Sequence, residues 1–266
     1  MSATSPSRTY VVTGSASGIG KALCEVLREK GHTVIGVDLR DADITVDLTT
    51  EQGRSDLVAE ATEKSGGVLD GVVAVAGLAA PIPATIGVNY FGAIATLEGL
   101  RPLLLGSAAP RAALVASLAA IEEGDDELLA ALVAGDEPKA LELAAALAGQ
   151  TLNGASNRIY NSSKRGIALW LRKNAPTETW AGASIPLNAI APGVIATPMI
   201  GDALSTAEGR AALDAGAPSP LNGPAAPPAA PANLLAWLVS EENTNTTGQV
   251  IFVDGGADSI RRPDWI

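Results

Sequence analysis

The chain has 266 residues, a net charge of −11 and one cysteine, Cys24. The acidic charge argues against nucleic-acid and anionic-membrane partners, because both select basic surfaces. A single cysteine and a single histidine, His32, exclude a disulfide, a cysteine cage and a histidine-rich metal site. No apolar run reaches the length of a membrane span, and no secretory signal is visible. We expect a cytoplasmic protein with one domain, residues 1–266.

A glycine-rich loop lies between the first strand and the first helix. The apolar run Tyr10 to Thr13 reads as a strand, and the helix after the loop ends at Gly31. Glycines let the backbone approach a pyrophosphate, and free N–H groups at the helix start bind its charge. The loop therefore predicts a dinucleotide site. Its expected cofactor contacts are Gly14, Ser17, Gly18, Ile19 and Gly20.

An acid follows the second strand, Thr33 to Val37. Asp38 stands where a dinucleotide-binding fold places the acceptor for a ribose hydroxyl, and Leu39 follows it. A carboxylate there would repel the 2′-phosphate of NADP, and Ser17 offers no cation to receive that phosphate. Arg40 is the one feature that could soften this preference. The sequence favours NAD over NADP.

Later strands also end in candidate site residues. Apolar runs at residues 71–76, 113–116, 187–191 and 250–253 are typical of a parallel sheet buried on both faces. We predict a single α/β domain with a Rossmann-type doubly wound parallel sheet. In such a sheet ligands bind beyond the carboxyl ends of the strands. The residues expected at this edge are Gly14, Asp38, Asp47, Leu48, Ala76, Gly77, Ser117, Pro192 and Gly193.

Helices and two unusual segments fill the remaining chain. Residues 51–64, 86–100 and 232–239 have helical patterns. Residues 120–155 form a helical insert, which is either an acidic surface hairpin or an oligomer contact or cleft wall. Residues 198–231 are rich in Ala, Pro and Gly and show no helical pattern. A stretch this long is a substrate lid or a mobile linker, and its place after a strand's carboxyl end favours a lid.

Tyr160 and Lys164 form the strongest chemical pair. They stand four residues apart on a predicted helix, so both lie on one face. A nearby ammonium favours the phenolate and lowers the pKa of the tyrosine. That lower pKa would make Tyr160 a usable general acid or base.

In this order the motifs resemble the short-chain dehydrogenase/reductase family, from about Thr9 to Gly256. The residues that carry the resemblance are Thr13-Gly14-x-x-x-Gly18-Ile19-Gly20, Asn89, Ser117, Tyr160-x-x-x-Lys164 and Pro192-Gly193. The stretches Val37 to Ala42 and Asn89 to Ala93, the insert and the Arg262-Pro263 tail are similar to the family's bacterial hydroxysteroid dehydrogenases, which also reduce carbonyl compounds.

The resemblance implies a role for each matching residue. Tyr160 would exchange a proton with the alcohol or carbonyl oxygen, and Ser117 would hydrogen-bond that oxygen. Lys164 would hold the nicotinamide ribose, and Asn89 would hold a water in a proton relay. Asp47 matches an adenine-contacting position. Thr197 and Ile195 match positions near the carboxamide.

Two departures from the family pattern qualify these roles. Ala74-Val75-Ala76-Gly77 stands where many members have Asn-Asn-Ala-Gly, so the asparagine's structural hydrogen bonds are missing. The interval from Ser117 to Tyr160 is about thirty residues longer than usual. Ser107 and Ser156 are weaker alternatives to Ser117, because neither ends a predicted strand.

We expect an NAD-dependent oxidoreductase of secondary alcohols and ketones, and the apolar lid suggests a hydrophobic cyclic or steroid-like substrate. A broad carbonyl reductase of xenobiotic aldehydes, quinones or aryl ketones is the alternative. A non-catalytic NAD-binding protein is a third hypothesis, which the intact set of polar residues disfavours. The insert predicts a homo-oligomer, a dimer or a tetramer.

Overall fold

Parallel strands form the centre of the molecule. The computed structural model describes residues 6–150 and 157–265. Its strands are β1 (Thr9–Thr13), β2 (Thr33–Asp38), β3 (Ile44–Thr45), β4 (Gly71–Ala74), β5 (Arg111–Val115), β6 (Leu187–Pro192) and β7 (Val250–Val253). They pair in the order β3-β2-β1-β4-β5-β6-β7, and each of these pairings is parallel. This is the doubly wound sheet that the sequence predicts, and its strand order reverses between β1 and β4.

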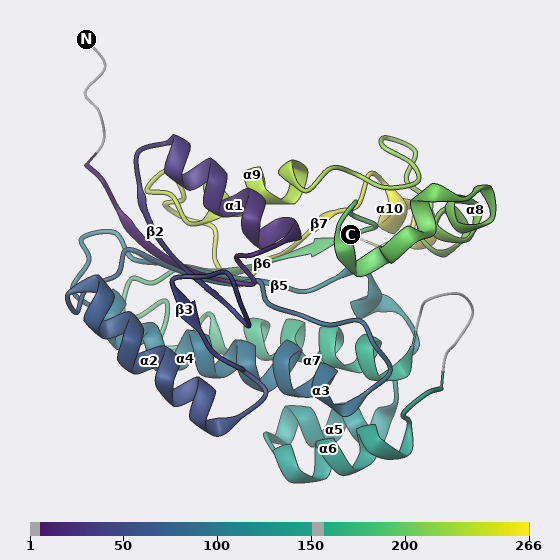
Figure 1. Ribbon diagram of the computed structural model, residues 1–266, viewed down its shortest axis with the longest axis horizontal. Coiled ribbons are helices and arrows are strands. Elements are labelled where there is room, and N and C mark those ends of the chain that lie inside the picture. The colour runs from purple at the N-terminus through teal and green to yellow at the C-terminus, as the bar shows by residue number, and fades with distance from the viewer. Residues whose placement is uncertain (1–5, 151–156, 266) are drawn as a thin grey trace.

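Helices cover both faces of the sheet (Figure 1). One face carries α1 (Gly18–Glu29) and α9 (Ala229–Leu238). The other face carries α2 (Glu51–Ser65), α4 (Ala93–Leu104) and α7 (Arg158–Asn174). Both faces of each central strand are therefore covered, as the continuous apolar runs in the sequence predict.

The sheet separates two apolar cores. Along β1, successive side chains point to opposite faces, so Val11 packs with the α2 side and Val12 with the α1 side. Both side chains are fully buried. Burying a valine side chain is worth about 1.5–3 kcal/mol, so this strand is strongly stabilised in its register.

The helix that carries Asn89 is longer than predicted and contains a wider turn. It begins with α3 (Pro83–Ile86), continues through a π-helical turn, η1 (Gly87–Gly92), and ends with α4 at Leu104. The predicted bounds were residues 86–100. Pro83 opens the first turn, where a missing N–H costs nothing. π-turns inside helices are frequent at functional sites, and this one includes Asn89.

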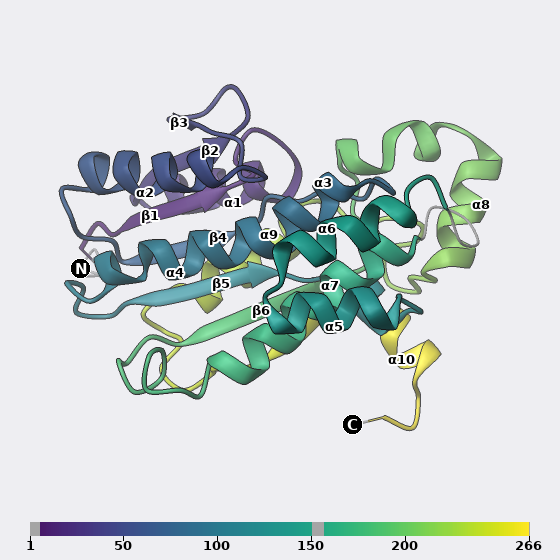
Figure 2. The same cartoon turned by 90° about the horizontal axis from the view of Figure 1, so that it is seen from below.

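The insert forms two helices that pack on their own chain. These are α5 (Asp126–Ala134) and α6 (Glu137–Ala146), which lie side by side next to α7 in Figure 2. Arg54 of α2 forms two hydrogen bonds with the Glu137 carboxylate, at 2.8 and 2.6 Å. The apolar side of α5 is buried through Leu128 and Leu132. The insert therefore covers the α3 and α7 region, and its residues 151–155 lie outside the described residues.

The segment expected to be an irregular lid contains short helices, one of which is interrupted by a kink at Gly201. They are η3 (Pro198–Ser205) and α8 (Ala207–Gly216), and α9 begins at Ala229 inside the expected bounds. The Thr206 hydroxyl accepts a hydrogen bond from Gly209 N and caps α8. Alanine is the best helix former, but few apolar residues mark a buried face in α8. For that reason the apolar pattern of the sequence does not predict this helix.

No helix in residues 6–150 and 157–265 is long and apolar enough to cross a membrane.

Candidate active site

The glycine loop joins β1 to α1 at the carboxyl edge of the sheet. Gly14 has a φ of +70°, and a Cβ there would lie 2.9 Å from the backbone nitrogen of Ala76. A Cβ at Gly20 would collide with the carbonyl of Gly14. The side chain of Ser17 forms no cap at the start of α1, which leaves the helix N–H groups open to a ligand. The loop can therefore cradle a phosphate with backbone groups.

Asp38 lies directly against this loop. Its carboxylate accepts hydrogen bonds from Ala16 N at 3.0 Å and from Leu39 N at 2.7 Å. The loop is thus held by the residue that is expected to bind the ribose. Leu39 itself is 63% exposed, so its side chain is available to a bound ligand.

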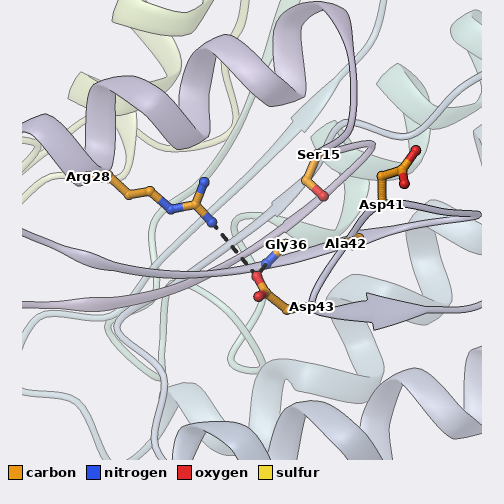
Figure 3. Close-up of a pocket in the computed structure, with 6 residues that line it drawn as sticks. All are labelled: Ser15, Arg28, Gly36, Asp41, Ala42 and Asp43. Atoms are coloured by element: carbon orange, nitrogen blue, oxygen red, sulfur yellow. Dashed lines mark hydrogen bonds and ion pairs between the residues drawn. The ribbon is translucent and has the colours of Figure 1, made fainter.

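A hollow of about 390 Å³ opens beside Ser15 of the glycine loop and Gly36 of β2 (Figure 3). Its lining includes Arg28 of α1 and Asp43, whose charged groups pair at 3.7 Å across the hollow. Asp43 also accepts a hydrogen bond from Gly36 N at 2.7 Å. From the sequence, Arg40 is the cation that could weaken the preference for NAD over NADP. The structure places a second cation, Arg28, at this hollow.

Thr13 forms hydrogen bonds with the chain that follows β4. Many members of the family have asparagine in this part of the chain, and here it is absent. The Thr13 hydroxyl accepts from Val75 N and from Ala76 N, each at 3.0 Å. The chain after β4 is therefore fixed against β1 despite the missing asparagine. Ala76 and Gly77 consequently lie beside the glycine loop, where the sequence places them.

Asp47 and Leu48 follow β3 and have different environments. Asp47 is exposed, and its carboxylate accepts hydrogen bonds from the backbone and hydroxyl of Thr49 at 2.9 and 2.7 Å. Leu48 is buried in the core on the α2 side. The adenine contact of this pair stays a prediction.

The segment after β6 returns to the glycine loop. Pro192 ends β6, and a Cβ at Gly193 would lie 2.9 Å from the Cα of Asp254. Ile195 is buried. The methyl group of Thr197 would lie 3.0 Å from a Cβ at Gly18. The structure therefore brings Thr197 to the glycine loop, and its contact with the nicotinamide carboxamide stays a prediction.

Asn157 sets the start of the helix that carries Tyr160. Its side-chain oxygen accepts from Tyr160 N at 2.8 Å, and its amide donates to the carbonyl of Ala79 at 2.8 Å. The cap thus fixes α7 against the chain that follows β4. This residue is not singled out in the sequence analysis, although asparagine directly before the first helical residue is a usual N-cap.

Lys164 is buried beside Tyr160 and reaches the end of β5. Its Nζ lies 5.8 Å from the centre of the Tyr160 ring and donates to the carbonyl of Val115 at 2.8 Å. A Cβ at Gly77 would lie 3.6 Å from the same Nζ. The ammonium therefore lies between the tyrosine and the chain after β4.

The pKa of Tyr160 is raised, whereas the sequence predicts that the neighbouring Lys164 lowers it. Burial raises the pKa of its phenol, and hydrogen bonding with the Ser117 side chain offsets part of this increase. Burial also lowers the pKa of Lys164 to about 8. A buried site disfavours both charged forms, so the lysine alone does not lower the tyrosine pKa as expected. Together these effects keep the phenol protonated and ready to donate.

Ser117 lies at the carboxyl end of β5 and begins a short 3-10 helix, η2 (Leu118–Ile121). Its hydroxyl accepts from Ala119 N at 3.1 Å, and the residue is buried. The alternative Ser107 donates to Asp70 at 2.5 Å, near the amino ends of the strands. The other alternative, Ser156, lies outside the described residues. Of the two candidates that the structure describes, Ser117 and Ser107, only Ser117 lies next to Tyr160.

The side chain of Asn89 makes three hydrogen bonds inside the protein. Its oxygen accepts from Leu78 N at 2.8 Å, and its amide donates to Leu78 O at 2.8 Å and to Ser163 Oγ at 3.0 Å. Asn89 thus fixes Leu78 at the edge of the site and joins η1 to α7. Its expected water contact stays a prediction. Ser163, which the sequence reading did not single out, completes this network.

The arrangement is matched by known proteins. Residues 8–126 match the short chain dehydrogenase family, and residues 131–258 match the family described as enoyl-(acyl carrier protein) reductase. The 3-alpha-hydroxysteroid dehydrogenase/carbonyl reductase of Comamonas testosteroni is 33% identical over 95% of this chain and 97% of its own. The cis-4-hydroxycyclohexanecarboxylate dehydrogenase of Sinomonas cyclohexanicum is 30% identical over 95% and 97%.

A solved structure shows the same fold. The 3-alpha-hydroxysteroid dehydrogenase from Pseudomonas sp. B-0831, complexed with NADH, has a TM-score of 0.86 and 38% identity over 97% of this chain and 100% of that chain. The chain belongs to the short-chain dehydrogenase/reductase family. It is an oxidoreductase of that family, and the resemblance to its bacterial hydroxysteroid dehydrogenases is confirmed.

Proposed function

We propose that the protein interconverts a secondary alcohol and a ketone with NAD(H), using Tyr160 as the general acid and base. The observation that carries this proposal is the grouping of Tyr160, Ser117 and Lys164 at the carboxyl edge of the sheet, beside the glycine loop. Such an edge is where an open α/β sheet binds its ligands.

Each side chain has a defined part in the reaction. In ketone reduction, Tyr160 donates its proton to the carbonyl oxygen, and Ser117 holds that oxygen with a hydrogen bond. In alcohol oxidation, the phenolate of Tyr160 accepts the hydroxyl proton. A bound nicotinamide cofactor supplies the hydride for reduction or accepts it in oxidation. Lys164, which already reaches both Tyr160 and Val115, positions the ribose of that cofactor.

Asp38 supports NAD over NADP. Its carboxylate is anchored by Ala16 N and Leu39 N, so it cannot turn away from the ribose without losing both hydrogen bonds. A 2′-phosphate would meet this fixed negative charge. The similar Pseudomonas enzyme was solved with NADH, which agrees with this preference.

Exposed apolar side chains favour a hydrophobic substrate. Leu78 and Ile82 follow β4, and Met199 and Leu221 belong to the segment after β6, with exposed fractions between 37% and 77%. These segments flank the carboxyl edge that carries Tyr160. The named activities of the Comamonas and Pseudomonas relatives support a hydroxysteroid as the substrate class. The Comamonas name also supports the broader alternative, a general carbonyl reductase.

The oligomeric state and the cellular location stay predictions. A homodimer is part of this proposal, although the buried sides of α5 and α6 already pack on their own chain. Light scattering on the purified protein checks it, and a monomer mass at assay concentration would remove it. The cytoplasmic location expected from the sequence is also part of this proposal.

The proposal is tested by turnover. Purified protein is mixed with NAD and a 3-hydroxysteroid, and NADH absorbance is followed, with NADP in a parallel sample. We expect NADH formation with the steroid and much slower reaction with NADP. Reaction only with aryl alcohols or quinones would favour the carbonyl reductase. Binding of NADH without turnover of any alcohol or ketone in a broad panel would contradict the proposal.

A further inference from the structure

Arg261 connects three segments that are distant in the sequence. It is the last residue of the C-terminal helix α10 (Ala257–Arg261). Its guanidinium forms an ion pair with Glu122 and donates a hydrogen bond to the carbonyl of Gly216. Arg261 is 24% exposed and Glu122 is 34% exposed, so solvent screens this pair less than it screens a free surface pair.

Both partners of Arg261 belong to parts of the candidate site. Gly216 is the last residue of α8, in the expected lid. Glu122 follows η2, the short helix that begins at Ser117. One side chain therefore joins the lid helix to the segment that carries a candidate catalytic hydroxyl. Figure 2 shows α8 and α10 at the same end of the molecule.

An apolar contact lies beside this polar one. Leu118, Ala217 and Ala257 are buried together, and each comes from one of the three segments that Arg261 connects. The three segments thus meet at two independent contacts, one apolar and one charged.

Besides the Arg261 contact, the chain after α8 is held by a hydrogen bond from Leu221 N to Gly255 O at 3.2 Å. Neither η3 nor α8 contains a buried side chain. The base of the segment is fixed more firmly, because Ala196 N donates to Ala226 O at 2.9 Å and Ala226 N donates to Val194 O at 3.0 Å. Because apolar burial is small along α8, the Arg261 contact carries a large share of its attachment.

We propose that Arg261 is a positioning residue that clasps α8 to the Ser117 segment and so sets the affinity for bulky apolar substrates. This inference rests on the proposed function, since it assigns the lid to the same site. With the clasp intact, α8 is held over the carboxyl edge of the sheet. Without it, α8 opens, and a bulky substrate loses contacts while the chemistry at Tyr160 is unchanged.

Arg262 provides a matched control. It is the adjacent residue, yet it pairs with Asp258 within its own segment at 2.7 Å and stacks on Trp265. No described contact joins it to α8 or to Glu122. Arg262→Met removes the same charge from the same helix end without touching the clasp.

The first experiment is limited trypsin digestion, which needs no activity. Arg210 in α8 is the only lysine or arginine between Lys173 and Arg261, so an opened α8 yields fragments 1–210 and 211–266. We expect Arg261→Met to be cut at Arg210 roughly five- to tenfold faster than wild type, because α8 loses its hydrogen bond to a charged group and opens more often. Arg262→Met is expected to be cut at the wild-type rate. Equal rates for wild type and Arg261→Met would overturn the proposal.

The second experiment is steady-state kinetics. For Arg261→Met we expect KM for a 3-hydroxysteroid to rise roughly five- to tenfold, with kcat and NADH affinity unchanged. Arg261→Lys keeps the ion pair with Glu122, so we expect its KM to lie between the values for wild type and Arg261→Met. A loss of kcat with unchanged KM would overturn the proposal.

A third variant guards against misfolding. If Arg261→Met does not fold, Glu122→Gln removes the same ion pair from the other side and is expected to expose Arg210 to trypsin. Where both fold, the double variant should be no worse than Arg261→Met, because removing the Arg261 guanidinium already removes its pair with Glu122. If wild type turns over no substrate, the proposed function fails, and the digestion result still decides whether the clasp exists.

Discussion

Lys164 donates a hydrogen bond from Nζ to the carbonyl oxygen of Val115, at 2.8 Å. This contact joins the middle of α7 to the end of β5, two residues before Ser117. It fixes the helix that carries Tyr160 against the strand that carries Ser117. The lysine therefore has a structural role that is independent of any cofactor.

The buried state of Lys164 makes stability depend on pH. Burial lowers its pKa from the ordinary 10.5 to about 8. Between these values the unfolded chain binds more protons than the folded protein, so the free energy of unfolding rises with pH. We predict that this rise, from pH 8 to pH 10, is roughly 2 kcal/mol larger in wild type than in Lys164→Met.

Urea unfolding of both proteins at several pH values measures this difference. Groups other than Lys164 titrate in both proteins and cancel in the comparison. The raised pKa of Tyr160 has its opposite effect only above its ordinary value of 10.0. Identical slopes for the two proteins would show that Lys164 stays fully charged in the folded state.

Asn89 is predicted to contribute to stability through Leu78. Asn89→Ala removes both hydrogen bonds to the Leu78 backbone and the one to Ser163. At about 1 kcal/mol for each hydrogen bond, we expect the free energy of unfolding to fall by roughly 2–4 kcal/mol. Urea unfolding at neutral pH measures this loss.

Ser163→Ala is the control for this prediction, because it leaves both Leu78 contacts in place and removes the contact with Asn89 and a hydrogen bond within α7, from Ser163 Oγ to Tyr160 O. Its expected loss is about 1 kcal/mol. Equal losses for the two variants would show that the Leu78 contacts do not stabilise the fold.

Much of this site could be predicted because short motifs fix it locally. Gly14 needs its glycine for a positive φ and a close approach to Ala76, and such positions are readable in a sequence. The pair Tyr160 and Lys164 is placed by helical spacing alone. Apolar strands with acids or glycines at their ends likewise predicted the doubly wound parallel sheet.

The failures have physical reasons as well. The helix α8 went unrecognised because its side chains stay unburied, so no apolar periodicity marks it. The pKa of Tyr160 was predicted in the wrong direction because burial, which depends on the whole fold, raises it, and hydrogen bonding with Ser117 offsets this only in part. Ser163 and Arg28 were missed because their partners are far away in the sequence.

Asp38 gives a prediction about cofactor choice. Asp38→Asn keeps a side-chain oxygen for one backbone hydrogen bond but removes the negative charge. We expect the ratio of kcat/KM for NADP to that for NAD to rise at least about tenfold, which needs only about 1.4 kcal/mol of relieved repulsion. Initial rates with each cofactor measure this ratio. An unchanged ratio would mean that Asp38 only supports the glycine loop.

The central claim is that Tyr160 is the proton donor and acceptor, and Tyr160→Phe tests it most directly. This change removes one oxygen and leaves the ring, the cap at Asn157 and the glycine loop in place. The decisive measurement is kcat for ketone reduction, with NADH affinity determined on the same preparation. The account predicts that kcat falls by about 10²–10⁴-fold while NADH affinity is unchanged. A variant that binds NADH and reduces the ketone at the wild-type rate would contradict it.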